Sequence, residues 1–186
     1  RAAFDRGDLD AAEAAWPASL RTEFQVLSAL RHGKPPRAAL RAVRTPLRRF
    51  WVNALQSAIF NHVLEQRRAD GTWSVLLPGD LALDVRGAKT FVVDEDTLEN
   101  ADVIGRVECG ELSATGPMWG PRMRRPQGSI LDLECAAIEA MGLEEGLLLG
   151  GREVQEGTRR RLRVCLADVD SSEGSDDCGP YFECTF

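Results

Sequence analysis

The 186-residue sequence predicts an α+β fold, in which a helical N-terminal part precedes a mixed α/β part with short hairpins. Three observations support this prediction. Segments with helical periodicity fill residues 1–68, short strand-like segments bounded by Gly and Pro follow, and helices and strands show no sustained βαβ alternation. With 44% hydrophobic residues, the chain can bury roughly 70% of its unfolded surface and so form a core.

The N-terminal helices are predicted from periodicity and from the residues that break it. Residues 9–30 are expected to form two short helices separated near Pro17, followed by the turn HGKPP. A basic helix is then expected to run to about Arg44. Thr45 and Pro46 form a start signal for a long helix to about Arg68, before Gly71.

The later segments predict a mixture of elements. Residues 72–85 favour a hairpin that turns at Pro78, Gly79 and Asp80, and TFVV favours a further strand. ATGPMWGPRM is too rich in Gly and Pro for regular structure and predicts a loop, whose Met118 and Trp119 fold back onto the core. The remaining expectations are a helix over 130–141 that starts at a Ser129/Asp132 capping box, a strand within 157–169, a polar loop over 170–179 and a last strand from 181.

Charge is distributed unevenly along the chain. Residues 1–68 hold 12 Lys and Arg against 6 Asp and Glu, a net charge of +6, and the remainder holds 11 against 23, a net charge of -12. Four basic residues at spacings of four, three and four are expected along one helical face: Arg37, Arg41, Arg44 and Arg48. Such a stripe suits a phosphate backbone, but a solvated face balanced by the acidic remainder is an equally open interpretation.

Cysteine usage and hydropathy exclude other classes of protein. Five cysteines without paired spacing favour reduced thiols over a disulfide framework, and their spacing from the two histidines favours no metal site. No apolar run approaches the roughly 18 residues of a membrane span, and the first residues lack a signal-peptide pattern. We therefore expect a cytoplasmic protein with no membrane partner. The start at Arg1 and the unfinished strand at YFECTF also predict a fragment.

Several motifs resemble one known family. FWVNALQSAIFNHVLEQR resembles the helix with an AxQSxxFNxxLxxR pattern in TruD-type tRNA pseudouridine synthases. Four later segments resemble the same family in the same order: GDLAL its short GD strand, ATGPMWG its Gly-Pro loop, Glu134 its acidic helix position, and GTRRRLRV its G-x-R-R strand. The resemblance covers about residues 20–186.

The resemblance implies an enzyme that isomerises a uridine in tRNA, typically in the D-arm, to pseudouridine without cofactor or metal. Its catalytic group would be an aspartate in a G-x-K-D-x-x-A motif, which breaks the bond between base and sugar by nucleophilic attack or proton removal. That motif is missing here, as are the family's N-Y-F-G-x-Q-R-F-G and LPKGxYATxxLRE segments. We therefore expect no catalytic residue in this chain and no activity from it alone.

The resemblance also implies a domain organisation. Residues 1–68 would form a helical segment whose helix over 45–68 lies at the junction with the catalytic core. Residues 69–160 would form the inserted TRUD domain, and residues 161–186 the return strands toward the core. The missing N-terminal and C-terminal parts of the enzyme, together with tRNA, would be its partners.

Candidate site residues follow from these motifs. RNA-binding candidates are the basic residues Arg37, Arg41, Arg44, Arg48, Arg159 and Arg161. Motif or cleft-supporting candidates are Asn53, Gln56, Ser57, Phe60, Asn61, Gly116, Pro117, Trp119, Glu134 and Arg160. The amides of the long helix would be buried and hold the missing motif segments, although satisfying local backbone or facing solvent is the preferred interpretation.

Arg160 is expected on the apolar face of its strand with Leu162 and Val164, opposite Arg159, Arg161 and Arg163. A guanidinium in that position needs an anion, and a structural carboxylate such as Glu134 or Asp168 is preferred over an RNA phosphate. A noncatalytic RNA-binding or interaction module on the same scaffold stays open as the alternative function.

Overall fold

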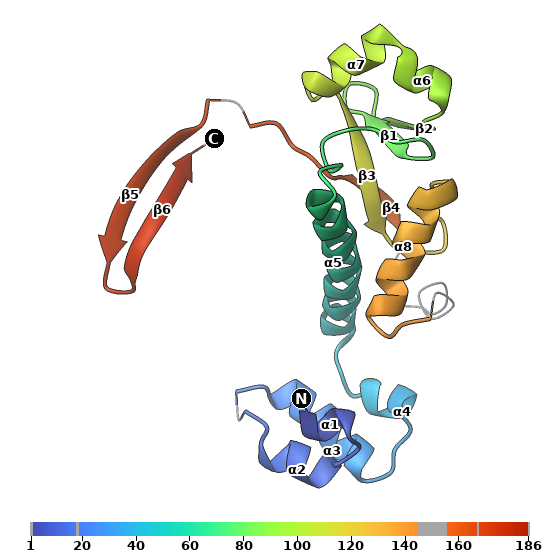
Figure 1. The fold of residues 1–186 in the computed structure, drawn as a ribbon. Coiled ribbons are helices and arrows are strands. Elements are labelled where there is room, and N and C mark those ends of the chain that lie inside the picture. Colours follow the sequence, from blue (N-terminus) through green and yellow to red (C-terminus); the bar gives the residue numbers. More distant parts are fainter. Residues whose placement is uncertain (1, 18, 145–155, 167, 186) are drawn as a thin grey trace. The chain divides into compact units, whose positions relative to one another are not determined.

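The computed structural model describes residues 2–17, 19–144, 156–166 and 168–185. The chain divides into two compact units, one containing the residues up to Gln56 and the other the described residues from Ser57 onward (Figure 1). This division falls inside a long helix and differs from the predicted boundaries at 68/69 and 160/161, which stay a prediction. Each unit is described by itself.

The first unit is helical. It contains α1 (Ala2–Asp5), α2 (Leu9–Ala14), α3 (Arg21–Arg31), α4 (Pro36–Leu40) and the start of α5 (Thr45–Ala69). The Asp8 carboxylate caps α2 by accepting from the Ala11 amide at 3.0 Å. Its small core consists of Ala12, Leu27, Ala39 and Val43. The helices on either side of Pro17 confirm the prediction.

The predicted basic helix is shorter than expected. α4 ends at Leu40, and Arg41–Arg44 form a turn before α5 begins at Thr45. Arg48, in the first turn of α5, donates to the Val43 carbonyl and to Thr45 Oγ1, the latter at 3.2 Å. The four arginines therefore do not share one helical face, because the 4-3-4 spacing crosses a helix boundary.

The second unit is built on an antiparallel sheet with strand order β2-β1-β3-β4. Its strands are β1 (Leu81–Asp84), β2 (Lys89–Val92), β3 (Leu112–Met118) and β4 (Thr158–Arg161). Two short helices, α6 (Glu95–Glu99) and α7 (Ala101–Glu108), connect β2 to β3, and α8 (Gly128–Ala140) follows β3. The mixed fold with antiparallel sheets confirms the α+β prediction.

The helices cover the sheet on two faces. Ala82, Ala114 and Leu162 point to one face, where they pack against Phe60 of α5; Leu64 of α5 and Val103 and Val107 of α7 line the same cluster. Because side chains alternate along a strand, Thr115 and Arg159 point to the other face, where Arg159 reaches Glu134 of α8. The core thus lies on both sides of β3.

Three segments differ from the sequence prediction. The hairpin of β1 and β2 turns at residues 85–88 rather than at Pro78–Asp80, because Asp80 is bound in a buried ion pair before β1 begins. Gly128, not Ser129, begins α8, and no side chain caps it. The strand predicted within 157–169 pairs only over Thr158–Arg161.

The segment ATGPM is a buried strand, not the predicted loop. Leu162 N donates to Ala114 O at 3.0 Å, so the polar backbone groups of Ala114 and Gly116 face β4. Pro117 therefore turns its nitrogen, which has no hydrogen, to the other side. There the pairing of β3 with β1 extends only from Leu112 to Ala114, so the proline costs the sheet no hydrogen bond.

The polar segment predicted as a loop also forms a strand. β5 (Asp170–Asp176) pairs with β6 (Gly179–Thr185) in a two-stranded hairpin, and β6 confirms the predicted last strand. Gly174 lies opposite Tyr181, whose ring occupies the space that a side chain at Gly174 would need. The polar sequence of β5 thus forms a strand through backbone pairing with β6, which contains aromatic residues, although its composition alone predicts a loop. Among the described residues, no helix combines the length and apolarity needed to cross a membrane.

Candidate functional site

Phe60, Gly116 and Arg160 form one packed group on the α5 face of the sheet. Gly116 and Arg160 are partners across β3 and β4, and Phe60 is 3% exposed. A Cβ added at Gly116 would lie 2.8 Å from Phe60 Cδ2, so only glycine leaves room for the ring. The Arg160 Cζ atom lies 5.0 Å from the ring centroid. The predicted side of Arg160 is confirmed, but its neighbour is an aromatic ring rather than a carboxylate.

The carboxylate of Glu134 belongs to Arg159 instead. Arg159 Nη2 and Nη1 donate to its two oxygens at 2.6 and 2.9 Å, and the Arg159 and Glu134 side chains are 4% and 0% exposed. Arg159 also donates to Thr115 Oγ1 at 3.0 Å and to Thr115 O at 2.6 Å. Burial raises the pKa of Glu134, and the opposing effect of Arg159 does not outweigh it. Glu134 is therefore paired with Arg159, the arginine of β4 that points to the face of the sheet covered by α8.

A second buried ion pair was not predicted. Arg67, in the last turn of α5, donates to both oxygens of Asp80 at 3.0 and 3.1 Å, and the two side chains are 2% and 0% exposed. Its remaining donors bind the carbonyls of Thr72 and Val75, and Asp80 accepts from the Leu77 amide at 2.8 Å. The sequence GD could have indicated this pair. An aspartate in a turn directly before a buried strand is itself buried, and its carboxylate then needs hydrogen-bond donors such as an arginine.

The polar residues of α5 separate into buried and exposed positions. Gln56 is 4% exposed, whereas Asn53 and Asn61 are exposed and Ser57 is half-buried. The expectation that all the amides are buried is therefore wrong, since they lie on different faces of the helix. For Asn53 and Asn61 the preferred interpretation, exposure to solvent, is the one that the structure shows.

Trp119 is buried as predicted. It is 1% exposed, directly after β3, and Arg125 lies over its ring with Cζ 5.2 Å from the centroid. Pro117 is likewise fully buried in β3. These residues of the Gly-Pro motif are thus part of the core of the second unit.

The basic candidates differ in what they contact. Arg37, Arg41 and Arg44 are exposed in and after α4, whereas Arg48 is partly buried and donates to the backbone after α4. Arg161 is half-buried at the end of β4. Arg159 is held by Glu134, so its charge is already compensated within the fold.

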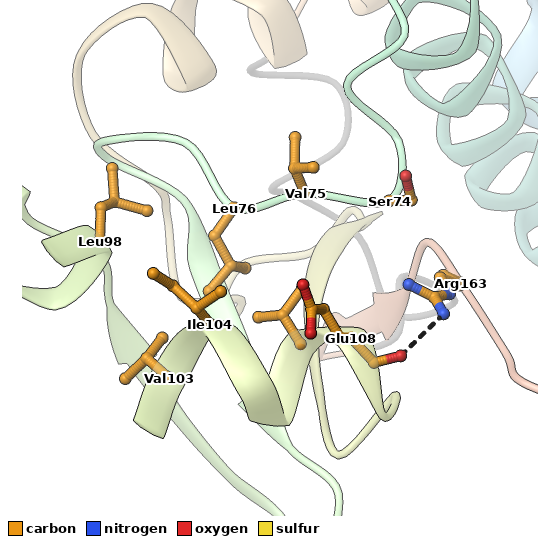
Figure 2. A pocket seen from close by; sticks show the side chains of 9 residues that line it. Ser74, Val75, Leu76, Leu98, Val103, Ile104, Glu108 and Arg163 are labelled. Atoms are coloured by element: carbon orange, nitrogen blue, oxygen red, sulfur yellow. Dashed lines mark hydrogen bonds between the residues drawn. The ribbon is translucent and has the colours of Figure 1, made fainter. Parts of the chain in front are cut away.

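A pocket of about 360 Å³ lies beside α7 (Figure 2). Its walls are mainly apolar, from Val75, Leu76, Leu98, Val103, Ile104 and Val107, with Ser74 and Glu108 adding polar atoms. Arg163 closes one side, where its Nη2 donates to the Glu108 carbonyl at 3.3 Å (Figure 2). Within the described residues, no cluster of three or more His, Cys, Asp and Glu is placed to hold a metal ion.

Comparison with known proteins identifies the family. The model of tRNA pseudouridine synthase D (TruD) matches residues 1–184. The chain belongs to the TruD family. It is 35% identical over 176 residues to tRNA pseudouridine synthase D of Geobacter metallireducens, covering 94% of this chain and 42% of the relative. The corresponding protein of Geotalea daltonii is 34% identical over 186 residues, covering 97% and 44%.

A solved structure agrees with the fold of the TruD family. A protein from Methanosarcina mazei, assigned as a tRNA pseudouridine synthase D, matches 98% of this chain and 45% of its own, with a TM-score of 0.66 and 20% identity. The family predicted from the five ordered motifs is confirmed. The chain spans less than half the length of the relatives that it matches.

Proposed function

We propose that this chain is the central part of a tRNA pseudouridine synthase, which isomerises a D-arm uridine of tRNA to pseudouridine in the cytoplasm. The family match over residues 1–184 is the observation that supports this most strongly. The G-x-K-D-x-x-A motif does not occur in the sequence, so the proposal places the catalytic aspartate in another part of the protein. The target base must leave its stack to reach that carboxylate, so this chain's contribution is to hold the RNA and support the cleft.

The proposal assigns RNA contacts to cations that the fold leaves uncompensated. Arg37, Arg41 and Arg44 are exposed, and among the described residues they form no ion pair or side-chain hydrogen bond. Arg31, by contrast, pairs with Asp10 at 3.0 Å and with Glu13. Arg159 no longer belongs among the RNA contacts, because Glu134 holds it. Arg161 stays a candidate.

The activity is tested with tRNA labelled with tritium at uridine C5, whose label is released when pseudouridine forms. The full-length protein is expected to release tritium, and the 186 residues alone are expected to release none. Turnover by the 186 residues alone would contradict the assignment of the nucleophile to another part. A full-length protein that has the catalytic motif but releases no tritium would contradict the activity itself.

The basic residues are tested by binding of tRNA at several salt concentrations. Because each neutralised phosphate releases counterions, replacing Arg37, Arg41 and Arg44 together by Gln should reduce the slope of log K against log salt by about 2–3. Arg31→Gln is the matched control, since the charge of Arg31 is compensated by two carboxylates. Equal slopes for the triple variant and the parent would remove these residues from the interface.

The missing motif also keeps a second function open, a noncatalytic RNA-binding module on the TruD scaffold. The sequence upstream of Arg1 decides between the two. A G-x-K-D-x-x-A motif there supports the enzyme, whereas its absence together with salt-dependent tRNA binding supports the binding module.

A further inference from the structure

Arg160 is a cation held in place by an aromatic ring. Its guanidinium lies over Phe60, whose own ring is fixed between Gly116 and the apolar cluster around Ala114 and Leu162. Phe60 is buried, whereas Arg160 is exposed. Stacking therefore restricts the guanidinium of an exposed residue.

The charge of Arg160 is not matched inside the fold. Its neighbour Arg159 binds both oxygens of Glu134, and Arg163 donates to the Glu108 carbonyl. Within the part of the chain that the structure describes, the Arg160 side chain forms no hydrogen bond and no ion pair; its one contact of this kind is with the Phe60 ring. The predicted carboxylate partner Glu134 is on the opposite face of the sheet. An anion that binds the exposed Arg160 guanidinium would therefore come from outside the described residues.

We propose that Arg160 binds a backbone phosphate of the RNA, with its guanidinium oriented by Phe60. This rests on the proposed function, since it names one contact of the same RNA. A guanidinium can bind a phosphate through two parallel N–H donors, and a guanidinium already held on a ring loses less conformational freedom on binding. The contact would position the RNA and would take no part in the chemistry.

The test uses the full-length protein and an unmodified tRNA transcript. Arg160→Gln removes the charge, and Arg160→Lys keeps the charge without the planar fork. Arg122→Gln is the matched control, because Arg122 is exposed but its charge is compensated by Glu156 at 2.7 Å. Binding is measured over a range of salt concentrations. Thermal unfolding midpoints show whether each variant is folded.

Arg160→Gln is expected to weaken binding about tenfold, and to reduce the slope of log K against log salt by about 0.7–0.9. Arg160→Lys should bind with intermediate affinity, and Arg122→Gln should bind as the parent does. In turnover, Arg160→Gln should raise KM for tRNA with kcat unchanged, because the contact is equal in ground and transition states.

Parental affinity and slope for Arg160→Gln, or a loss equal to that of Arg122→Gln, would overturn the proposal. If Arg160→Gln is not folded, Arg160→Lys decides: intermediate affinity supports the phosphate contact, and parental affinity overturns it. A parent that neither binds tRNA nor forms pseudouridine would instead refute the proposed function. A parent that does both, with Arg160→Gln identical to it, refutes this inference alone.

Discussion

Replacing Glu134 by Gln is expected to destabilise the fold by about 3–5 kcal/mol, the usual cost of removing one partner of a buried ion pair. Both side chains are almost completely buried, and Arg159 binds Glu134 through two hydrogen bonds of 2.6 and 2.9 Å. Without the carboxylate, the guanidinium keeps only the oxygens of Thr115 as partners. An uncompensated charge would then remain inside the sheet.

The assay is urea-induced unfolding followed by circular dichroism, with a double variant as the control. Arg159→Met combined with Glu134→Leu removes both charges and should cost less than Glu134→Gln alone, because no unpaired charge remains. A loss below about 1 kcal/mol for Glu134→Gln would contradict the buried pair, since that is the range of exposed pairs. A double variant less stable than the single one would show that the cost comes from lost packing.

The pKa of Glu134 adds a test with a defined sign. Burial raises this pKa above its ordinary value of 4.5. A carboxyl group with a raised pKa in the folded state contributes stability that is fully present below pH 4.5 and is lost as the pH rises through the raised value. The difference in unfolding free energy between the parent and Glu134→Gln should change across that window. A constant difference from pH 4 to 8 would show that the pKa is not raised.

Three further predictions concern the second unit. Gly116→Ala would place a Cβ 2.8 Å from Phe60 Cδ2, so urea unfolding should show a loss of about 1–3 kcal/mol, which Phe60→Leu partly restores. Asn100→Ala removes the cap of α7, an acceptor 2.9 Å from the Asp102 amide, and should cost about 1 kcal/mol in the same assay. Hydrogen bonds from Thr97 lower the pKa of Asp94 below 3.8, so its stabilisation should be lost only as the pH falls through the lowered value. Thermal midpoints of the parent and Asp94→Ala should therefore converge in acid.

The long helix was predictable because its signals are local. Thr45, Pro46 and Gly71 mark its ends within a few residues, and the structure places α5 at Thr45–Ala69. The strand over Leu112–Met118 was not predictable in the same way. Gly116 and Pro117 normally favour a loop, and they are tolerated here by the ring of Phe60 and by the end of the pairing with β1, both distant in sequence.

The candidate site shows the same division between local and distant information. Alternation along β4 correctly placed Arg160 with Leu162 and Arg159 on the other side. The identity of each partner depended on which helix covers each face. Glu134 is on α8 and Phe60 on α5, so the carboxylate pairs with Arg159 and the ring with Arg160. Sequence spacing gives the face of a side chain but not what is packed against that face.

Three consecutive arginines therefore have three different environments, which affects how the charge of this chain is interpreted. Arg159 is neutralised by Glu134, Arg160 is oriented by Phe60, and Arg161 is half-buried at the end of the strand. In the first unit, Arg31 and Arg48 are likewise bound by groups of the fold. The count of 12 Lys and Arg over residues 1–68 is thus larger than the number of cations available to a phosphate backbone. Because salt dependence follows the phosphates contacted rather than the residues counted, the slope for the intact protein should reflect only the uncompensated arginines.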